Sequence, residues 1–118
     1  MILDAAIEVH RTLGGPGLLE SVYEECLVEE LTRRSLRVRR QVPVPLNYKG
    51  KQLGTQLRVD LIVEDRVIVE CKATTQYNVV FESQLLTYLR LTGLKAGLVL
   101  NFGERAMKQG VHRVVNGL

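Results

Sequence analysis

The chain of 118 residues is 46% hydrophobic and 25% charged, which suits one globular domain, residues 1–118, and is too short for two cores. No apolar run approaches the length of a membrane span, and the N-terminus lacks a signal-peptide pattern. The net charge of +3 slightly favours an anionic partner. The two cysteines, Cys26 and Cys71, fall at apolar positions, which favours reduced core thiols and a cytoplasmic location.

Apolar spacing and turn residues divide the chain into helices and strands. Spacings of three and four predict the helices, valine-rich runs predict the strands, and Gly14-Gly15-Pro16-Gly17 separates the first two helices. The predicted elements, in chain order, are helices at 2–13 and 18–34, strands at 37–48, 57–63 and 67–72, a helix at 81–91, a strand at 96–102, and a helical turn before a strand at 111–115. This order predicts an α/β fold in which helices flank a mixed β-sheet.

Two carboxylates and a lysine lie on neighbouring predicted strands. Glu70 and Lys72 flank Cys71, so alternation places them on one face of a strand while Cys71 faces the core. Asp60 lies on the preceding strand and reaches the same point if the two strands form a hairpin. Charges at the ends of such apolar strands require a partner or an ion. The pattern predicts a Mg²⁺ site with a lysine beside an activated water; exposed strand-end charges are the alternative.

The register of this hairpin decides whether the two carboxylates meet. With Asp60 opposite Glu70, the hairpin closes through the three-residue loop 64–66. A two-residue turn would instead set Asp60 opposite Cys71 and direct its side chain away from Glu70. We expect the three-residue loop or a compensating bulge.

Three residues on the predicted helices are further candidates. Glu20 borders the apolar stripe of the second helix and could complete a metal site, although a glutamate in a first turn often only matches the helix dipole. Gln84 and Tyr88 are four residues apart and therefore share a face of the third helix. They are candidates to support the site, and if they do so, they must face Glu70 and Lys72.

Basic residues cluster between the second helix and the first strand. Such a run is usually a solvated surface, and it is equally what contact with nucleic-acid phosphates requires. Arg58 shares the face of Asp60 by alternation and is a candidate contact to a phosphate. The candidate nucleic-acid-binding residues are Arg37, Arg39, Arg40 and Arg58. The scattered histidines and cysteines do not match a zinc site, and the sequence has no P-loop.

The segment Gly17-x-x-Glu20-x-x-Tyr23 resembles the motif that names the GxxExxY proteins, a branch of the PD-(D/E)XK nuclease superfamily. The resemblance runs over nearly the whole chain. It implies a restriction-endonuclease-like core in α-β-β-β-α-β order, here with an extra N-terminal helix. Asp60 matches the acid of the first catalytic strand, although Val59 replaces the proline of the motif, and Glu70 and Lys72 match the (D/E)XK pair.

The resemblance also implies roles for the helical residues and a function. Glu20 matches the helical acid, and Gln84 and Tyr88 resemble the Gln-x-x-x-Tyr motif of the RecB-like exonuclease branch. The implied function is Mg²⁺- or Mn²⁺-dependent hydrolysis of DNA phosphodiesters, with the metal held by Asp60, Glu70, the backbone carbonyl of Cys71 and Glu20. The alternative is a nucleic-acid-binding or regulatory module with little turnover. The sequence leaves open DNA or RNA, endonuclease or exonuclease, and monomer or homodimer.

Overall fold

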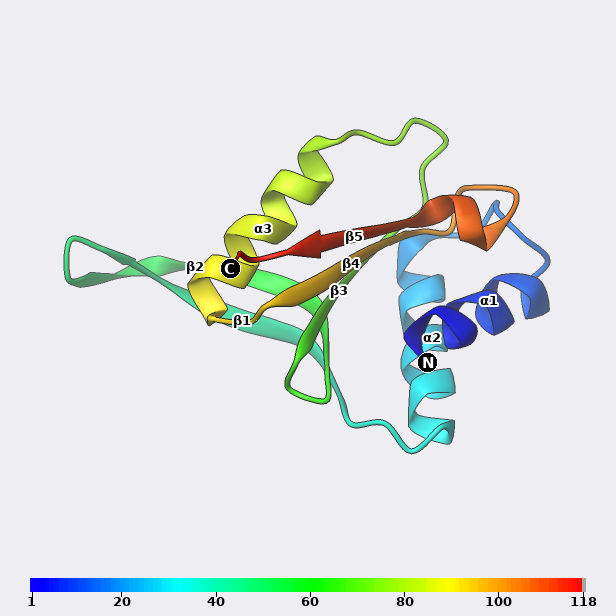
Figure 1. Ribbon diagram of the computed structural model, residues 1–118, viewed down its shortest axis with the longest axis horizontal. Coiled ribbons are helices and arrows are strands. Elements are labelled where there is room, and N and C mark those ends of the chain that lie inside the picture. Colours follow the sequence, from blue (N-terminus) through cyan, green and yellow to red (C-terminus); the bar gives the residue numbers. More distant parts are fainter. Residues whose placement is uncertain (118) are drawn as a thin grey trace.

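Five strands form one sheet in the computed structural model, which describes residues 1–117 (Figure 1). The elements in chain order are α1 (Ile2–Thr12), α2 (Glu20–Arg33), β1 (Val38–Tyr48), β2 (Lys51–Val63), β3 (Val67–Lys72), α3 (Val80–Thr92), β4 (Ala96–Asn101), the 3-10 helix η1 (Met107–Gly110) and β5 (Val111–Val115). The predicted elements are confirmed, with small shifts at their ends and a longer β2. Leu118, the last residue of the predicted domain, lies outside the described residues.

The strand order across the sheet is β1-β2-β3-β4-β5. Neighbouring strands are antiparallel except β3 and β4, which are parallel because α3 connects them. The fold is therefore α/β with a mixed sheet flanked by helices, as predicted, and it is consistent with a restriction-endonuclease-like core. None of the helices within residues 1–117 is both long and apolar enough to cross a membrane.

Two apolar cores lie on opposite faces of the sheet. The first core packs α1 and α2 against one face, and the second core packs α3 against the other. Burying both faces explains why β3 and β4 are apolar at nearly every position. Cys71 is fully buried in the first core and Cys26 is partly buried beside it, both as unpaired thiols, which agrees with the prediction. The fully buried side chains that the first core contributes from the helices are Ala5, Ala6, Tyr23, Leu27 and Leu31.

The segment that resembles the GxxExxY motif joins α1 to α2. Gly17 has a φ of 121°, a conformation that favours glycine. Tyr23 is fully buried and stacks on Phe102 with ring centroids 4.7 Å apart. Its hydroxyl donates to the Gly15 carbonyl at 2.7 Å and accepts from the Leu18 N–H at 3.2 Å. The tyrosine therefore fixes the connection that places the start of α2.

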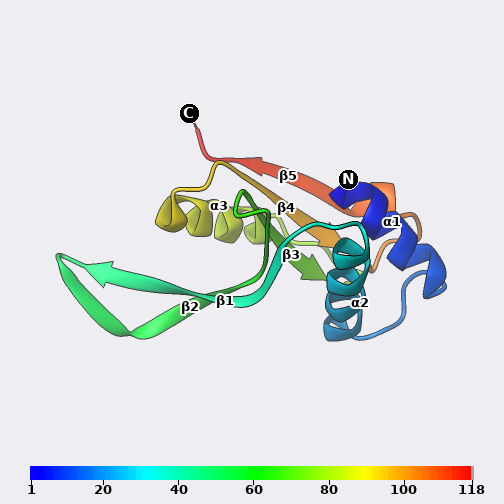
Figure 2. The same cartoon turned by 90° about the horizontal axis from the view of Figure 1, so that it is seen from below.

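The sheet forks between β2 and β3. These strands pair only through Leu61–Val63 and Val67–Val69 among the described residues. Val63 lies opposite Val67 and residues 64–66 form the turn, so the predicted three-residue loop is confirmed. Before Leu61, β2 pairs with β1, and the two strands form a ribbon that projects from the rest of the molecule (Figures 1 and 2). After Val69, β3 continues beside β4. Asp60 and Glu70 are the residues at the fork.

Candidate active site

Both strands of the ribbon rotate at the fork. The β1–β2 register skips Gln41 and Asp60, which would otherwise be partners, and Gln41 has a φ of 53°. On β2, Leu61 packs in the first core whereas Val59 packs in the second. Simple alternation would put these two side chains on one face, so the strand turns over at Asp60. The prediction from sequence assumed that side chains alternate along the whole strand. In the structure this alternation is interrupted at Asp60.

The Asp60 and Glu70 carboxylates cross the gap between their strands. The Asp60 N–H donates to Glu70 Oε2 at 2.8 Å. The Cys71 N–H donates to Asp60 Oδ2, also at 2.8 Å. Each carboxylate thus satisfies a backbone donor of the other strand, just where the ladder between the strands has ended. The two acids are held in place by the backbone.

Burial makes this pair of carboxylates reluctant to ionise. Desolvation raises the pKa of Glu70 to about 8, and the charge of Asp60 raises it further against the opposing effect of the backbone hydrogen bond. Desolvation likewise raises the pKa of Asp60 to about 6, with contributions from the charges of Glu24 and Glu20. Two neighbouring acids with raised pKa values are typical of a functional site that a cation would neutralise.

Lys72 and Tyr88 lie near this pair. The Lys72 Nζ is 4.6 Å from the centroid of the Phe81 ring on α3, and its charge favours ionisation of both Asp60 and Glu70, lowering their pKa values. Burial raises the pKa of the half-buried Tyr88, and the charges of Glu70 and Asp60 raise it further. The structure therefore brings the lysine and the tyrosine within electrostatic range of the two acids.

Glu24 is an acid near the fork that was not predicted from the sequence. Its side chain is buried on α2, and its Oε2 accepts from Arg40 Nε at 2.7 Å and from Gln41 Nε2 at 2.8 Å. The same Gln41 amide approaches Asp60 Oδ1 at 3.5 Å, so it links the two carboxylates. The signal was present in part, since Glu24 lies between Tyr23 and Leu27 on the buried stripe of a helix. No feature of the sequence marks Gln41.

Two predicted helical residues lie less close to the pair. Glu20 is the first residue of α2 and is exposed, although its charge contributes to the raised pKa of Asp60. Gln84 is exposed on α3, next to the fully buried Leu85, and no hydrogen bond joins its side chain to another residue within 1–117. Within the described residues, Gln84 is therefore not fixed beside Asp60 and Glu70 by a hydrogen bond, unlike these two acids, which are fixed to each other's strands.

Most of the candidate nucleic-acid-binding arginines are in ion pairs. Arg58 is the exception: its Nη1 donates to the Gln41 carbonyl at 3.2 Å. The pairs are Arg37–Glu64 at 3.7 Å, Arg39–Asp65 at 3.1 Å and Arg40–Glu24 at 2.7 Å. Exposed pairs such as the first two are worth little in water, so their guanidinium groups remain able to exchange partners.

The donor atoms at the fork suit a hard divalent cation. Asp60 and Glu70 each use one oxygen on a backbone N–H. Among the described residues, the second oxygen of Glu70 has no hydrogen-bond donor and that of Asp60 has only the Gln41 amide at 3.5 Å, so both can take another ligand. Oxygen donors are what Mg²⁺ and Mn²⁺ prefer, and a cation would offset the desolvation and the neighbouring negative charges that raise both pKa values. Within residues 1–117, however, no three histidine, cysteine, aspartate or glutamate side chains are positioned together to hold a metal ion. The protein side chains supply two ligands, and the remaining positions fall to carbonyl, water or substrate oxygens.

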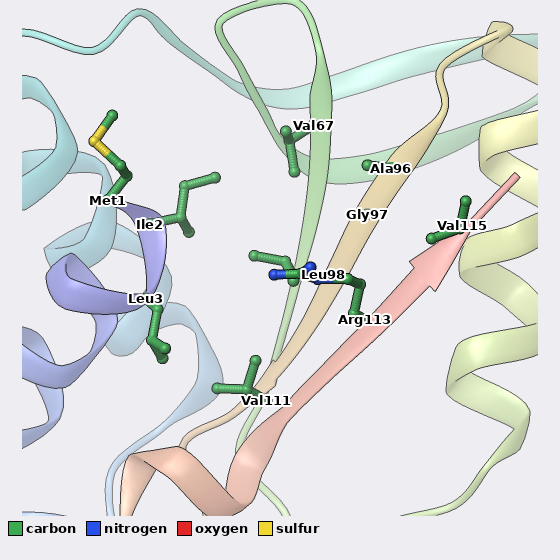
Figure 3. Close-up of a pocket in the computed structure, with 10 residues that line it drawn as sticks. All are labelled: Met1, Ile2, Leu3, Val67, Ala96, Gly97, Leu98, Val111, Arg113 and Val115. Atoms are coloured by element: carbon green, nitrogen blue, oxygen red, sulfur yellow. The ribbon is translucent and has the colours of Figure 1, made fainter.

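An apolar groove of about 470 Å³ lies apart from these acids (Figure 3). It runs between the start of α1 and the β3–β4–β5 part of the sheet, and none of its lining residues is acidic. The groove is lined by Met1, Ile2, Leu3, Val67, Ala96, Gly97, Leu98, Val111, Arg113 and Val115. Its lining lacks the groups that phosphodiester chemistry needs, so the candidate active site is the fork and not this groove.

A forked mixed sheet with paired strand acids and a lysine defines a restriction-endonuclease-like protein. A family model described as the PD-(D/E)XK nuclease superfamily matches residues 1–114, and the chain therefore belongs to this superfamily. No curated protein and no solved structure matches the chain significantly. The narrower resemblance to the GxxExxY proteins stays a prediction.

Proposed function

We propose that the protein is a Mg²⁺- or Mn²⁺-dependent nuclease that hydrolyses DNA phosphodiester bonds. The observation that carries the proposal is the pair of hydrogen bonds by which Asp60 and Glu70 cross the fork, which fixes two desolvated carboxylates side by side. Membership of the nuclease superfamily supports the reaction class. The proposal assigns the catalytic roles to residues at the fork.

Asp60, Glu70 and the backbone carbonyl of Cys71 would hold the metal in this proposal. When bound, the metal would polarise the phosphate and lower the pKa of a coordinated water. The oxygen donors of these residues match the preference of the metal for hard ligands. Because the pKa values are raised to about 6 for Asp60 and about 8 for Glu70, Glu70 keeps its proton near neutral pH, and a bound metal would displace it.

Lys72 would orient the attacking water and offset the negative charge that develops on the phosphate. Its ammonium group is close enough to favour ionisation of both acids, which supports this role. Glu20 and Glu24 would bind waters around the metal, and Gln41 would keep Asp60 in position through its link to Glu24. Tyr88 would brace the site, and Gln84, being exposed, would contact the bound nucleic acid.

A binding or regulatory module is the second candidate function. The absence of a third acidic ligand beside Asp60 and Glu70 within the described part of the chain favours it. Against it stands the electrostatic argument: adjacent carboxylates repel phosphate, and a protein that only binds nucleic acid has no use for them.

Titration calorimetry with Mn²⁺ and Mg²⁺, followed by incubation with supercoiled, linear and single-stranded DNA, tests the proposal. We expect divalent-metal binding and metal-dependent cleavage that Glu70→Gln abolishes. Metal-free protein that binds DNA, with wild type and Glu70→Gln leaving the DNA equally intact in Mn²⁺, would establish the binding module instead. Equal cleavage by both proteins would trace the activity to a contaminant and refute the proposal.

A further inference from the structure

The projecting ribbon is a positively charged segment without a single carboxylate. Residues 41–59, here called the basic arm, contain Lys49, Lys51 and Arg58, whereas all 13 aspartates and glutamates lie elsewhere in the chain. None of these three cations forms an ion pair with any other residue in the described range 1–117, unlike the arginines that precede the arm. The base of the arm packs against α3, and its tip extends beyond the helices in both views (Figures 1 and 2). Its charge is therefore available to an anionic partner.

The tip of the arm carries an exposed aromatic ring beside the two lysines. Tyr48 is 62% exposed, and the Lys49 Nζ lies 5.4 Å from the centroid of its ring. Tyr48 pairs with Lys51, and the intervening Lys49 and Gly50 have φ values of 50° and 83°. Positive φ at both central residues is the geometry of a two-residue turn that matches the twist of the strands. The lysines and the tyrosine are thus presented on a tight turn and not on a long loop.

The outer strand of the arm is poorly suited to pairing with another protein strand. Pro43 and Pro45 lie on β1 opposite Arg58 and Gln56, and β1 is the edge of the sheet. Proline has no N–H to donate, so two donors are missing along this edge. With Lys49 in the turn and Lys51 directly after it as well, strand addition is disfavoured, and the charge points to a polyanion as the partner.

We propose that the basic arm lies along a groove of duplex DNA and extends the contact away from the site of cleavage. The major groove admits a two-stranded β-ribbon. From Asp60 to Lys51 is nine residues along β2, which at about 3.3 Å per residue is about 30 Å. At about 3.4 Å per base pair, the tip would reach the duplex about nine base pairs from the phosphate at the fork. This inference rests on the proposed function and adds the substrate class and the direction of contact.

Binding of fluorescein-labelled duplexes of 6 to about 24 base pairs, measured by anisotropy in EDTA, tests the arm without cleavage. We expect Lys49→Gln/Lys51→Gln to weaken binding to the longer duplexes about tenfold near 0.1 M salt, and to reduce the slope of log affinity against log salt by about 2. Tyr48→Ala should weaken it a few-fold. On duplexes shorter than about nine base pairs the double variant should bind like the wild type, since the tip then has no DNA to contact.

Arg66→Gln/Lys108→Gln is the matched control, because it removes the same charge from exposed residues outside the arm that form no ion pair within residues 1–117. If the control weakens binding as much as the arm variant does, the loss of affinity follows from net charge alone, and the inference is overturned. If the arm variant loses as much affinity for single-stranded DNA of the same length, the proposed contact with a groove of duplex DNA is overturned. If the arm variants bind DNA like the wild type and the protein still cleaves DNA, the proposal for the basic arm is overturned and the proposed function stands. Wild-type protein that binds no DNA would overturn both the arm and the proposed function.

Discussion

The fork and the basic arm are built from one strand, β2, and have opposite electrostatics. At the fork, Asp60 is largely buried beside Glu70, and both acids resist ionisation. Ten residues earlier, the tip of the arm is exposed, cationic and free of acids. Carboxylates that repel phosphate are thus confined to the position where a cation would neutralise them, while attraction is supplied at a distance. If the proposed function holds, one hairpin separates catalysis at the fork from substrate binding at the arm.

The largest effect should come from the acids and the lysine at the fork. Asp60→Asn and Glu70→Gln keep the shape of the side chains but lose the charge that holds a cation, so metal affinity and cleavage should both fall, cleavage by at least about 100-fold. Lys72→Ala should lose cleavage but keep metal binding, because lysine does not act as a ligand here. Calorimetry and a DNA cleavage assay measure the two properties separately.

Glu25→Gln serves as the control, since this acid is exposed on α2. A Lys72→Ala protein that loses metal binding together with activity would contradict the separation of roles. An active Glu70→Gln protein would remove the fork from the chemistry altogether.

Glu24 tests whether the fork extends to α2. Removing its carboxylate breaks the charge-assisted hydrogen bonds from Arg40 and Gln41, so Glu24→Ala should lower the free energy of unfolding by about 1–3 kcal/mol, measured by urea denaturation. Glu24→Gln retains an acceptor and should destabilise less. Both variants should reduce cleavage about tenfold, because partners of metal ligands typically affect activity to this degree. Full activity in Glu24→Gln would confine its role to packing.

The pH dependence follows from the raised pKa values. Between the ordinary values of 3.8 and 4.5 and the raised values of about 6 and about 8, the folded metal-free protein binds more protons than the unfolded chain. Its free energy of unfolding should therefore fall as the pH rises across this range. The extra stability is fully present below the ordinary values and lost above about 8.

A divalent cation should reverse this trend. Because protons compete with the metal for the same oxygens, Mn²⁺ should raise the melting temperature more at pH 8 than at pH 5.5, and its affinity should be at least about tenfold higher at the upper pH. In EDTA at pH 8, Glu70→Gln should melt above the wild type, since it removes a buried charge. A melting temperature that rises with pH in EDTA would argue that the pair is already neutralised by the protein.

The smallest effect is expected at Gln84. As an exposed side chain it should contribute little, so Gln84→Ala should change the free energy of unfolding by about 0.5 kcal/mol or less. If Gln84 contacts bound DNA, the same variant should weaken DNA affinity measurably, with exposed Thr87→Ala on the same helix as the control. Identical DNA affinity and turnover in Gln84→Ala and the wild type would reduce the Gln-x-x-x-Tyr spacing to coincidence.

Local pattern in the sequence was enough to predict the elements and the hairpin that brings the strand acids together. Apolar periodicity and turn residues depend on near neighbours, and they predicted the helices, the strands and the buried thiol of Cys71. The 64–66 loop was predicted from the register that Asp60 and Glu70 need in order to meet, because the loop length sets the register of β2 against β3. The elements and the buried thiol, in contrast, need no knowledge of distant contacts.

The surroundings of the acids were decided by the tertiary structure. Glu24 reaches the fork only because α2 packs across β1, and its hydrogen bonds join residues 16 and 17 positions apart. The positive φ of Gln41 and the rotation of β2 at Asp60 arise where the ribbon leaves the sheet, so alternation could not reveal them. The fold also decides which arginines form ion pairs, and why the basic arm forms none with residues 1–117, because it determines which side chains lie within reach of one another. Hydrophobic periodicity predicts which residues are buried along one helix or strand, whereas a site combines residues from several elements that pack together.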